Sequence, residues 1–214
     1  MKEITFYLDF ISPYAYLAFE ELPQALQGLS YSVRYKPVVL GALLRHHGSL
    51  GPAEIPAKRE WTYRHVMWLA HNKGLVLDMP AVHPFNPMGL LRLAVGTDET
   101  GLPNRYVCET LFRHVWQGAA DAVDATRVQA LAAALAPPRG ATEDSVKAQL
   151  KSHTDAALEL KIFGVPAFEV DGKVFWGLDA LPMLRAYLEG DAWFSDANWN
   201  APLALPSGLP PVKA

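Results

Sequence analysis

The first 35 residues hold a strand pattern, a helix pattern and a second strand pattern with almost no chain between them. Residues 4–10 alternate apolar and more polar side chains, and residues 31–35 do so again, which indicates two strands. Between them, apolar residues follow helical spacing over 15–29. A connection this short between strands implies a right-handed crossover and parallel pairing. The chain is therefore expected to begin with a β-α-β unit.

The rest of the chain is predicted to be helical until its last quarter. From about residue 39 to 161 the apolar spacing is helical, with breaks at clusters of Gly and Pro. Strand patterns return at 167–170 and 173–176, joined by Asp171-Gly172, a pair suited to a type I′ turn. Asp179 is expected to cap a last amphipathic helix, and the prolines after residue 200 predict an extended or disordered tail.

This order of elements predicts an α/β protein with a thioredoxin-like fold (βαβ…ββα). The outer parts, 1–38 and 162–200, would form one mixed sheet with a helix on each face. Residues 39–161 would then be an inserted all-helical subdomain, and 201–214 a tail. At 214 residues the chain is long enough to bury a core of this size.

Composition limits the classes of partner. With 19% charged residues and a net charge of −3, the chain shows no basic excess that would favour nucleic acid. Its apolar runs are shorter than a membrane span, and the start resembles a strand rather than a signal peptide. Cys108, the single cysteine, is expected in the core. One cysteine allows no intramolecular disulfide, which fits a reducing compartment. We therefore expect a cytoplasmic protein without a nucleic-acid or membrane partner.

Ser12-Pro13 stands between the first strand and the first helix. Such a turn presents free backbone N–H groups and the positive end of the helix dipole. Thioredoxin-type redox enzymes carry Cys-x-x-Cys at this position; the serine here excludes dithiol chemistry. The site can hold a thiolate from elsewhere, although Ser12 can also be read as an N-cap alone.

Four segments together resemble the 2-hydroxychromene-2-carboxylate isomerases, relatives of the kappa-class glutathione transferases within the DsbA-like thioredoxin superfamily. They are DFISPYAYL at 9–17, YKPVVLG at 35–41, FGVPAF at 163–168 and WGLD at 176–179. The resemblance extends to about residue 195. It implies a glutathione-dependent cis–trans isomerase that acts as a homodimer on a small-molecule aromatic substrate. The reaction would interconvert 2-hydroxychromene-2-carboxylate and trans-o-hydroxybenzylidenepyruvate-type compounds in aromatic degradation.

The resemblance also implies a glutathione site. Ser12 would be the catalytic residue at the glutathione sulfur, and Val165, before a cis Pro166, would pair with the peptide backbone. The γ-glutamyl end would lie at the segment formed by Trp176, Gly177, Leu178 and Asp179. The alternatives are a plain strand start at Pro166 and a simple cap at Asp179. The family often has an arginine where Ala180 stands.

The substrate side is less clearly marked. Ser49, Lys58 and Asn86 lie in segments that resemble the loops beside the substrate. Lys58 could pair with a carboxylate or simply face solvent, and Asn86 could bind a substrate oxygen or form a turn before a helix. Some family members carry an asparagine where Ser49 stands. The histidine spacing does not match a metal site, so no metal is expected.

Two other functions use the same residues. A kappa-like glutathione transferase or peroxidase would share the role of Ser12, and a non-catalytic glutathione-binding protein would share the fold. Consumption of glutathione during turnover separates a transferase from an isomerase, and tight binding without turnover would indicate the binding protein.

Overall fold

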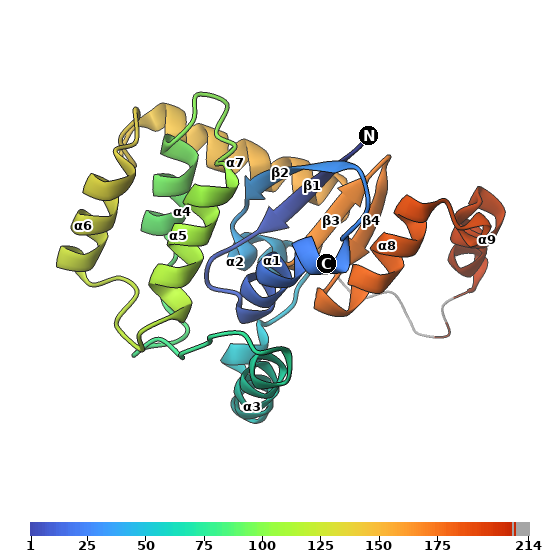
Figure 1. Cartoon of the computed structure of the whole chain (residues 1–214), viewed down its shortest axis with the longest axis horizontal. Coiled ribbons are helices and arrows are strands. Elements are labelled where there is room, and N and C mark those ends of the chain that lie inside the picture. Colours follow the sequence, from blue (N-terminus) through green and yellow to red (C-terminus); the bar gives the residue numbers. More distant parts are fainter. Residues whose placement is uncertain (207, 209–214) are drawn as a thin grey trace.

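The computed structural model describes residues 1–206 and 208, with elements in the predicted order (Figure 1). The chain begins with β1 (Lys2–Leu8), α1 (Pro13–Ala25) and β2 (Tyr31–Pro37). The central helices are α2 (Leu40–His46), α3 (Pro56–Lys73), α4 (Met88–Gly96), α5 (Arg105–Trp116), α6 (Ala125–Leu135) and α7 (Asp144–Glu159). The last part comprises β3 (Ala167–Val170), β4 (Lys173–Trp176), α8 (Leu181–Glu189) and α9 (Asp196–Asn200).

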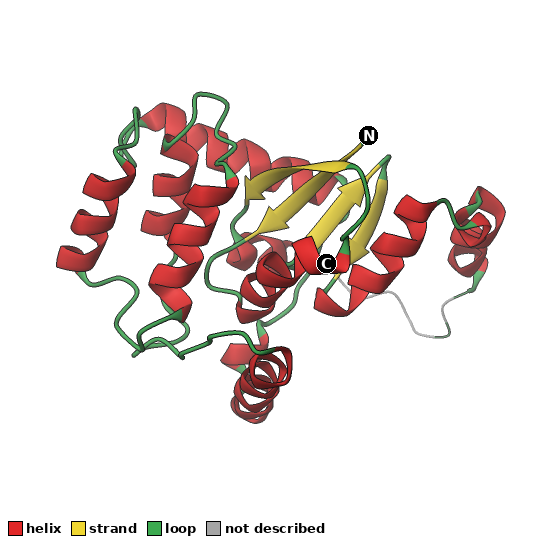
Figure 2. Cartoon of the chain, in the orientation of Figure 1, coloured by secondary structure: helices red, strands yellow, loops and turns green. Residues whose placement is uncertain are grey.

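The four strands form one mixed sheet in the order β2-β1-β3-β4 (Figure 2). β2 runs parallel to β1 in the register Lys2↔Tyr31 to Leu8↔Pro37, as the short crossover predicts. β3 is antiparallel to β1 and β4 is antiparallel to β3. Asp171 and Gly172, at the tip of the hairpin, both have positive φ, at 52° and 79°, which suits the predicted type I′ turn. The α/β class and the thioredoxin-like fold are confirmed.

The placement of helices on the sheet differs from the expectation. α1 and α8 contact each other and lie on the same face, where Phe6 and Leu8 of β1 point into the main core. Tyr7 points to the opposite face, into a second cluster with Leu43 of α2 and Ala157 of α7. The prediction of one helix from the outer parts on each face was therefore wrong. The second face is covered by the central segment instead.

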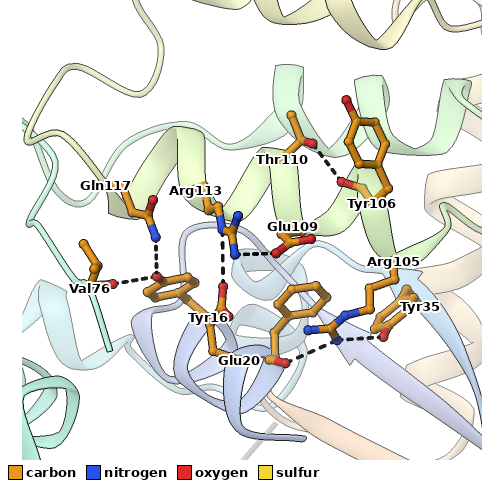
Figure 3. A network of polar contacts seen from close by, with 11 residues as sticks. Tyr16, Glu20, Tyr35, Val76, Arg105, Tyr106, Glu109, Thr110, Arg113 and Gln117 are labelled. Carbon is orange, nitrogen blue, oxygen red and sulfur yellow. Dashed lines mark hydrogen bonds and ion pairs between the residues drawn. The ribbon is translucent and has the colours of Figure 1, made fainter. Parts of the chain in front are cut away.

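The central helices share the main core with the sheet. Phe112 of α5 is fully buried, and its ring centroid lies 4.9 Å from that of Phe10 and 5.2 Å from that of Phe19. Polar contacts flank this packing: Gln117 Nε2 donates to the Tyr16 hydroxyl at 3.0 Å (Figure 3). The boundaries of the inserted subdomain, 39–161, stay a prediction, since the packing across them is continuous.

Two element ends differ from the apolar pattern. α1 ends at Ala25, although the apolar spacing continues to residue 29, and Gly28 follows with φ 86°. In the predicted tail, Ala201–Ala204 form a short 3-10 turn. The remainder of that prediction includes positions 207 and 209–214, which lie outside the described residues. Across the described part of the chain, no helix combines the length and apolarity needed to cross a membrane.

Candidate functional site

Ser12 lies at the start of α1, in the turn that follows β1. Its Oγ accepts a hydrogen bond from Ala15 N at 3.2 Å, and Pro13 occupies the first helical position. This is the predicted N-cap, which leaves the remaining N–H groups of the first turn without helical partners. The side chain is largely buried, with 6% of its surface exposed. Ser12 therefore stands at a point of positive potential that water reaches only partly.

The Val165–Pro166 peptide lies against this serine. The bond is cis, as the resemblance implies, and Ser12 Oγ donates to Val165 O at 3.4 Å, across 153 positions of sequence. Within residues 1–206 and 208, no hydrogen bond reaches the Val165 N–H. Val165 stands two residues before the first residue of the strand β3, so its backbone offers a position where an extended peptide can pair.

The segment after β4 joins the same site. Gly177 N donates to Pro166 O at 2.9 Å, and the Gly177 φ of 104° is one that only glycine adopts readily. Leu178–Ala180 form a 3-10 turn that continues into α8. A Cβ on Gly177 would lie 2.4 Å from Asp179 Oδ1. Glycine at this position therefore leaves room for the Asp179 side chain at the start of the 3-10 turn.

A buried acid lies beneath the Ser12 turn. Asp9 Oδ1 accepts from Ile11 N at 3.2 Å, and Oδ2 accepts from Leu40 N at 2.9 Å. Burial raises the pKa of Asp9 to about 7, against the effect of the backbone N–H donors. Leu40 belongs to the second of the four segments that carry the resemblance, and through Asp9 that segment reaches the site. The sequence analysis assigned Asp9 no role. The signal that could have identified it is a single acidic residue at the end of an apolar strand.

Helix α3 places aromatic side chains beside the start of α1. The Tyr14 hydroxyl lies 2.9 Å from His65 Nδ1, and the His65 ring stacks in parallel with those of Trp61 and Trp68. Both tryptophans are more than half exposed. Burial raises the pKa of Tyr14, and the charge of Asp179 raises it further. Sequence reasoning assigned no role to this aromatic face, although the spacing of 61, 65 and 68 marks one side of a helix.

The three predicted substrate residues are all exposed and belong to different parts of the central segment. Lys58 is exposed in the first turn of α3, three residues before Trp61 and on the same side of the helix. Ser49 is exposed, and its Oγ lies 3.4 Å from His47 O. Asn86 Oδ1 accepts from Met88 N at 3.1 Å, beside a groove of about 510 Å³ between α4 and α6. Asn86 thus has the turn geometry that was its alternative interpretation.

Cys108 is fully buried in the main core, as predicted, and burial raises the pKa of its thiol. Among the described residues, no group of three or more His, Cys, Asp and Glu side chains is placed to hold a metal ion. A reactive sulfur at Ser12 would therefore come from a bound molecule.

A family model described as "DSBA-like thioredoxin domain" matches residues 3–189. The chain belongs to the DsbA-like thioredoxin family. The 2-hydroxychromene-2-carboxylate isomerase of Pseudomonas putida is 30% identical over 192 residues, covering 86% of this chain and 92% of that protein. Glutathione S-transferase kappa 1 of Rattus norvegicus is 24% identical over 212 residues, covering 90% of this chain and 92% of the relative. The resemblance seen in the four segments is confirmed.

Solved structures support the fold of this DsbA-like protein. A 2-hydroxychromene-2-carboxylate isomerase structure superposes with a TM-score of 0.74 at 22% identity, covering 95% of this chain and all of the other. The cytosolic disulfide reductase DsbM from Pseudomonas aeruginosa, solved with GSH, superposes with a TM-score of 0.54 at 16% identity, covering 87% of this chain and 97% of the other. Both likenesses concern the fold alone.

Proposed function

We propose that this protein is a glutathione-dependent cis–trans isomerase of the 2-hydroxychromene-2-carboxylate isomerase type. One observation carries the proposal: the Ser12 hydroxyl, at the N-terminus of α1, contacts the Val165 carbonyl beside a cis-proline. The site combines a hydroxyl donor, a helix N-terminus and an open backbone position, while the single cysteine, Cys108, is buried in the main core. Its relatives named as isomerases and kappa transferases point the same way.

The site fits glutathione in three places. Ser12 and the first turn of α1 would hold the sulfur as a thiolate. The Val165 backbone would pair with the peptide, beside Pro166. The 3-10 turn at Leu178 and Asp179, next to Trp176 and Gly177, would hold the charged γ-glutamyl end, because free N–H groups gather at such a start. When bound, glutathione supplies the sulfur nucleophile that adds reversibly to a conjugated carbonyl, so that the adjacent carbon–carbon bond can rotate.

The chain's own residues would activate and orient the bound sulfur. The Ser12 Oγ–H is free to turn from Val165 O towards an anion, since the two oxygens lie 3.4 Å apart in its absence. Together with the helix dipole, this donor lowers the pKa of a bound thiol from its ordinary value of about 8.5. Burial of Ser12 strengthens both effects, because the local dielectric is lower than that of water.

For the substrate we propose the side of the site formed by α3. Trp61 and Trp68 offer exposed aromatic surface, and Lys58, on the same side of the helix, offers a cation for a carboxylate. Ser49 and Asn86 stay predictions. Among the described residues, the side-chain hydrogen bonds of Ser49 and Asn86 go to nearby backbone, and none goes to the Ser12 turn.

The experiment is substitution of Ser12 by alanine, with glutathione turnover and binding as readouts. Ser12→Ala is expected to reduce kcat/KM roughly 10- to 100-fold, because a hydrogen bond to a charged group contributes about 1.5–3 kcal/mol. The substitution also removes an N-cap, which costs about 1 kcal/mol of stability. Asn104→Ala is the matched control, since Asn104 caps α5 in the same way through Val107 N at 3.0 Å.

Asn104→Ala should lose similar stability and keep full activity. Full activity in Ser12→Ala would overturn the proposal.

The second candidate, a kappa-like transferase or peroxidase, is favoured by the rat relative. It predicts that glutathione is consumed in step with turnover, whereas an isomerase returns it unchanged. Tight glutathione binding without turnover would indicate a non-catalytic binding protein. Cytoplasmic location, the homodimer and the role in aromatic degradation stay predictions.

A further inference from the structure

Two ring N–H groups from the central helical segment bind the turn that precedes Ser12. Trp116 Nε1, at the end of α5, donates to Phe10 O at 2.9 Å. His83 Nε2, in the loop before α4, lies 2.9 Å from Ile11 O. A carbonyl oxygen can only accept, so Nε2 of His83 carries the proton. Of the three carbonyls between the end of β1 and Ser12, those of Phe10 and Ile11 are therefore held from outside the β-α-β unit, whereas that of Asp9 accepts from Ser12 N.

The His83 contact acts directly on Ser12. Ile11 C=O and Ser12 N–H belong to one planar peptide group, so an orientation imposed on the carbonyl is imposed on the N–H as well. At the opposite edge of the same peptide group, Ser12 N donates to Asp9 O at 3.1 Å. These two bonds hold the Ser12 backbone from which Oγ projects, and the contacts of Oγ with Ala15 N and Val165 O set its direction.

His83 is itself held in one orientation. The Tyr63 hydroxyl, from α3, lies 2.8 Å from His83 Nδ1 and 2.9 Å from the His83 carbonyl oxygen. The His83 ring packs against the Trp116 ring, with centroids 5.5 Å apart. Burial lowers the pKa of His83, which favours the neutral ring. In that ring Nε2 donates to Ile11 O, and both Nδ1 and the His83 carbonyl oxygen are acceptors that share the single Tyr63 hydroxyl proton. Tyr63 therefore supports the tautomer that the turn needs.

We propose that His83, oriented by Tyr63, is a positioning residue that fixes the Ser12 turn for thiolate binding. It acts through the Ile11 carbonyl and touches no reacting atom. The proposal rests on the proposed function of Ser12, but its geometric part concerns the free protein. It gives the loop at 83–87 a role through His83, and it connects α3 to the site through Tyr63.

The first test needs no ligand. Amide hydrogen exchange of Ser12 and Ala15 is measured in the wild type, His83→Phe and His83→Gln. Phenylalanine keeps a ring of similar size without the N–H, whereas the glutamine amide can replace the Nε2 donor. We expect exchange to quicken about tenfold or more in His83→Phe, the factor for a lost hydrogen bond, and to recover in His83→Gln.

His114→Phe is the matched control. His114 Nε2 lies 3.0 Å from Ala122 O, and burial lowers its pKa too, so the same kind of contact is removed elsewhere. It should lower global stability without a selective effect on Ser12. If His83→Phe does not fold, Tyr63→Phe replaces it, with a smaller effect in the same direction. Unchanged exchange at Ser12, or an equal change in His114→Phe, would overturn the inference.

The second test uses bound glutathione. In His83→Phe the pKa of the bound thiol, followed by thiolate absorbance, should rise by about one pH unit, the size expected when a charged site loses one supporting hydrogen bond. Affinity for S-methylglutathione, which has no ionisable thiol, should stay within about twofold. An unchanged thiol pKa alongside faster exchange would also overturn the inference. Failure of the wild type to bind glutathione would contradict the proposed function, while the exchange result still decides the role of His83.

Discussion

Phe112→Ala is the substitution that tests most severely whether sheet and central helices share one core. Phe112 is fully buried on α5 and packs against Phe10 and Phe19 of the β-α-β unit, with Tyr16 at a centroid distance of 5.9 Å. Removal of a buried phenylalanine side chain costs about 3–5 kcal/mol. Because aromatic pairs add about 0.5–1.5 kcal/mol beyond burial, we expect a value near the upper end, about 4–5 kcal/mol.

Urea unfolding followed by far-ultraviolet circular dichroism and by tryptophan fluorescence measures this loss. Both probes should report one transition, shifted together, because helices and sheet lose the same contacts. Phe112→Leu should cost much less, since most of the volume is kept. Tyr106→Ala is the control on the same helix: Tyr106 is 64% exposed, so its loss should change stability by about 0.5 kcal/mol or less. A loss below about 1 kcal/mol in Phe112→Ala, or two separate transitions, would refute the shared core.

Three further predictions concern single groups. Burial lowers the pKa of His153 to about 4, so between about pH 4 and 6.5 the unfolded chain binds more protons than the folded one. The stability contributed by the neutral His153 is therefore lost as the pH falls through that range. The urea midpoints at neutral pH and at about pH 4.5 should differ less in His153→Phe than in the wild type, and an equal difference would contradict the assignment. Cys108, buried with a raised thiol pKa, should react with an aromatic disulfide reagent only at the rate of unfolding, and rapid modification of the native protein would be the contrary result. Gly177→Ala should weaken glutathione binding more than about tenfold by calorimetry, because its Cβ would lie 2.4 Å from Asp179 Oδ1, whereas Gly172→Ala, in open space at similar φ, should leave affinity unchanged.

Local patterns predicted the elements because local forces decide them. The alternation in residues 4–10 and 31–35 reflects strands whose side chains alternate between two faces. Asp171-Gly172 adopts the two positive φ angles that a tight hairpin needs. Ser12 caps α1 through a contact with Ala15, three residues away. Each of these rests on contacts within a few positions or on a short crossover.

Arrangements that depend on distant contacts were not predictable in the same way. Packing against α1 sets the face of the sheet on which α8 lies. The apolar spacing within either helix does not indicate which face of the sheet that helix covers. Asp9 and Leu40 meet across 31 positions, and His83 meets Ile11 across 72. Without the resemblance, even the contact between Ser12 and Val165 would have had no signature in the sequence.

The pKa of the glutathione thiol bound to this protein tests the central claim most directly. Thiolate absorbance is titrated against pH for the complex of the wild type and for that of Ser12→Ala. The Ser12 hydroxyl and the N-terminus of α1 predict a bound pKa at least about one unit below the ordinary thiol value of about 8.5. They also predict a clear rise in Ser12→Ala. A bound thiol that titrates at or above its ordinary pKa in the wild type would contradict the account.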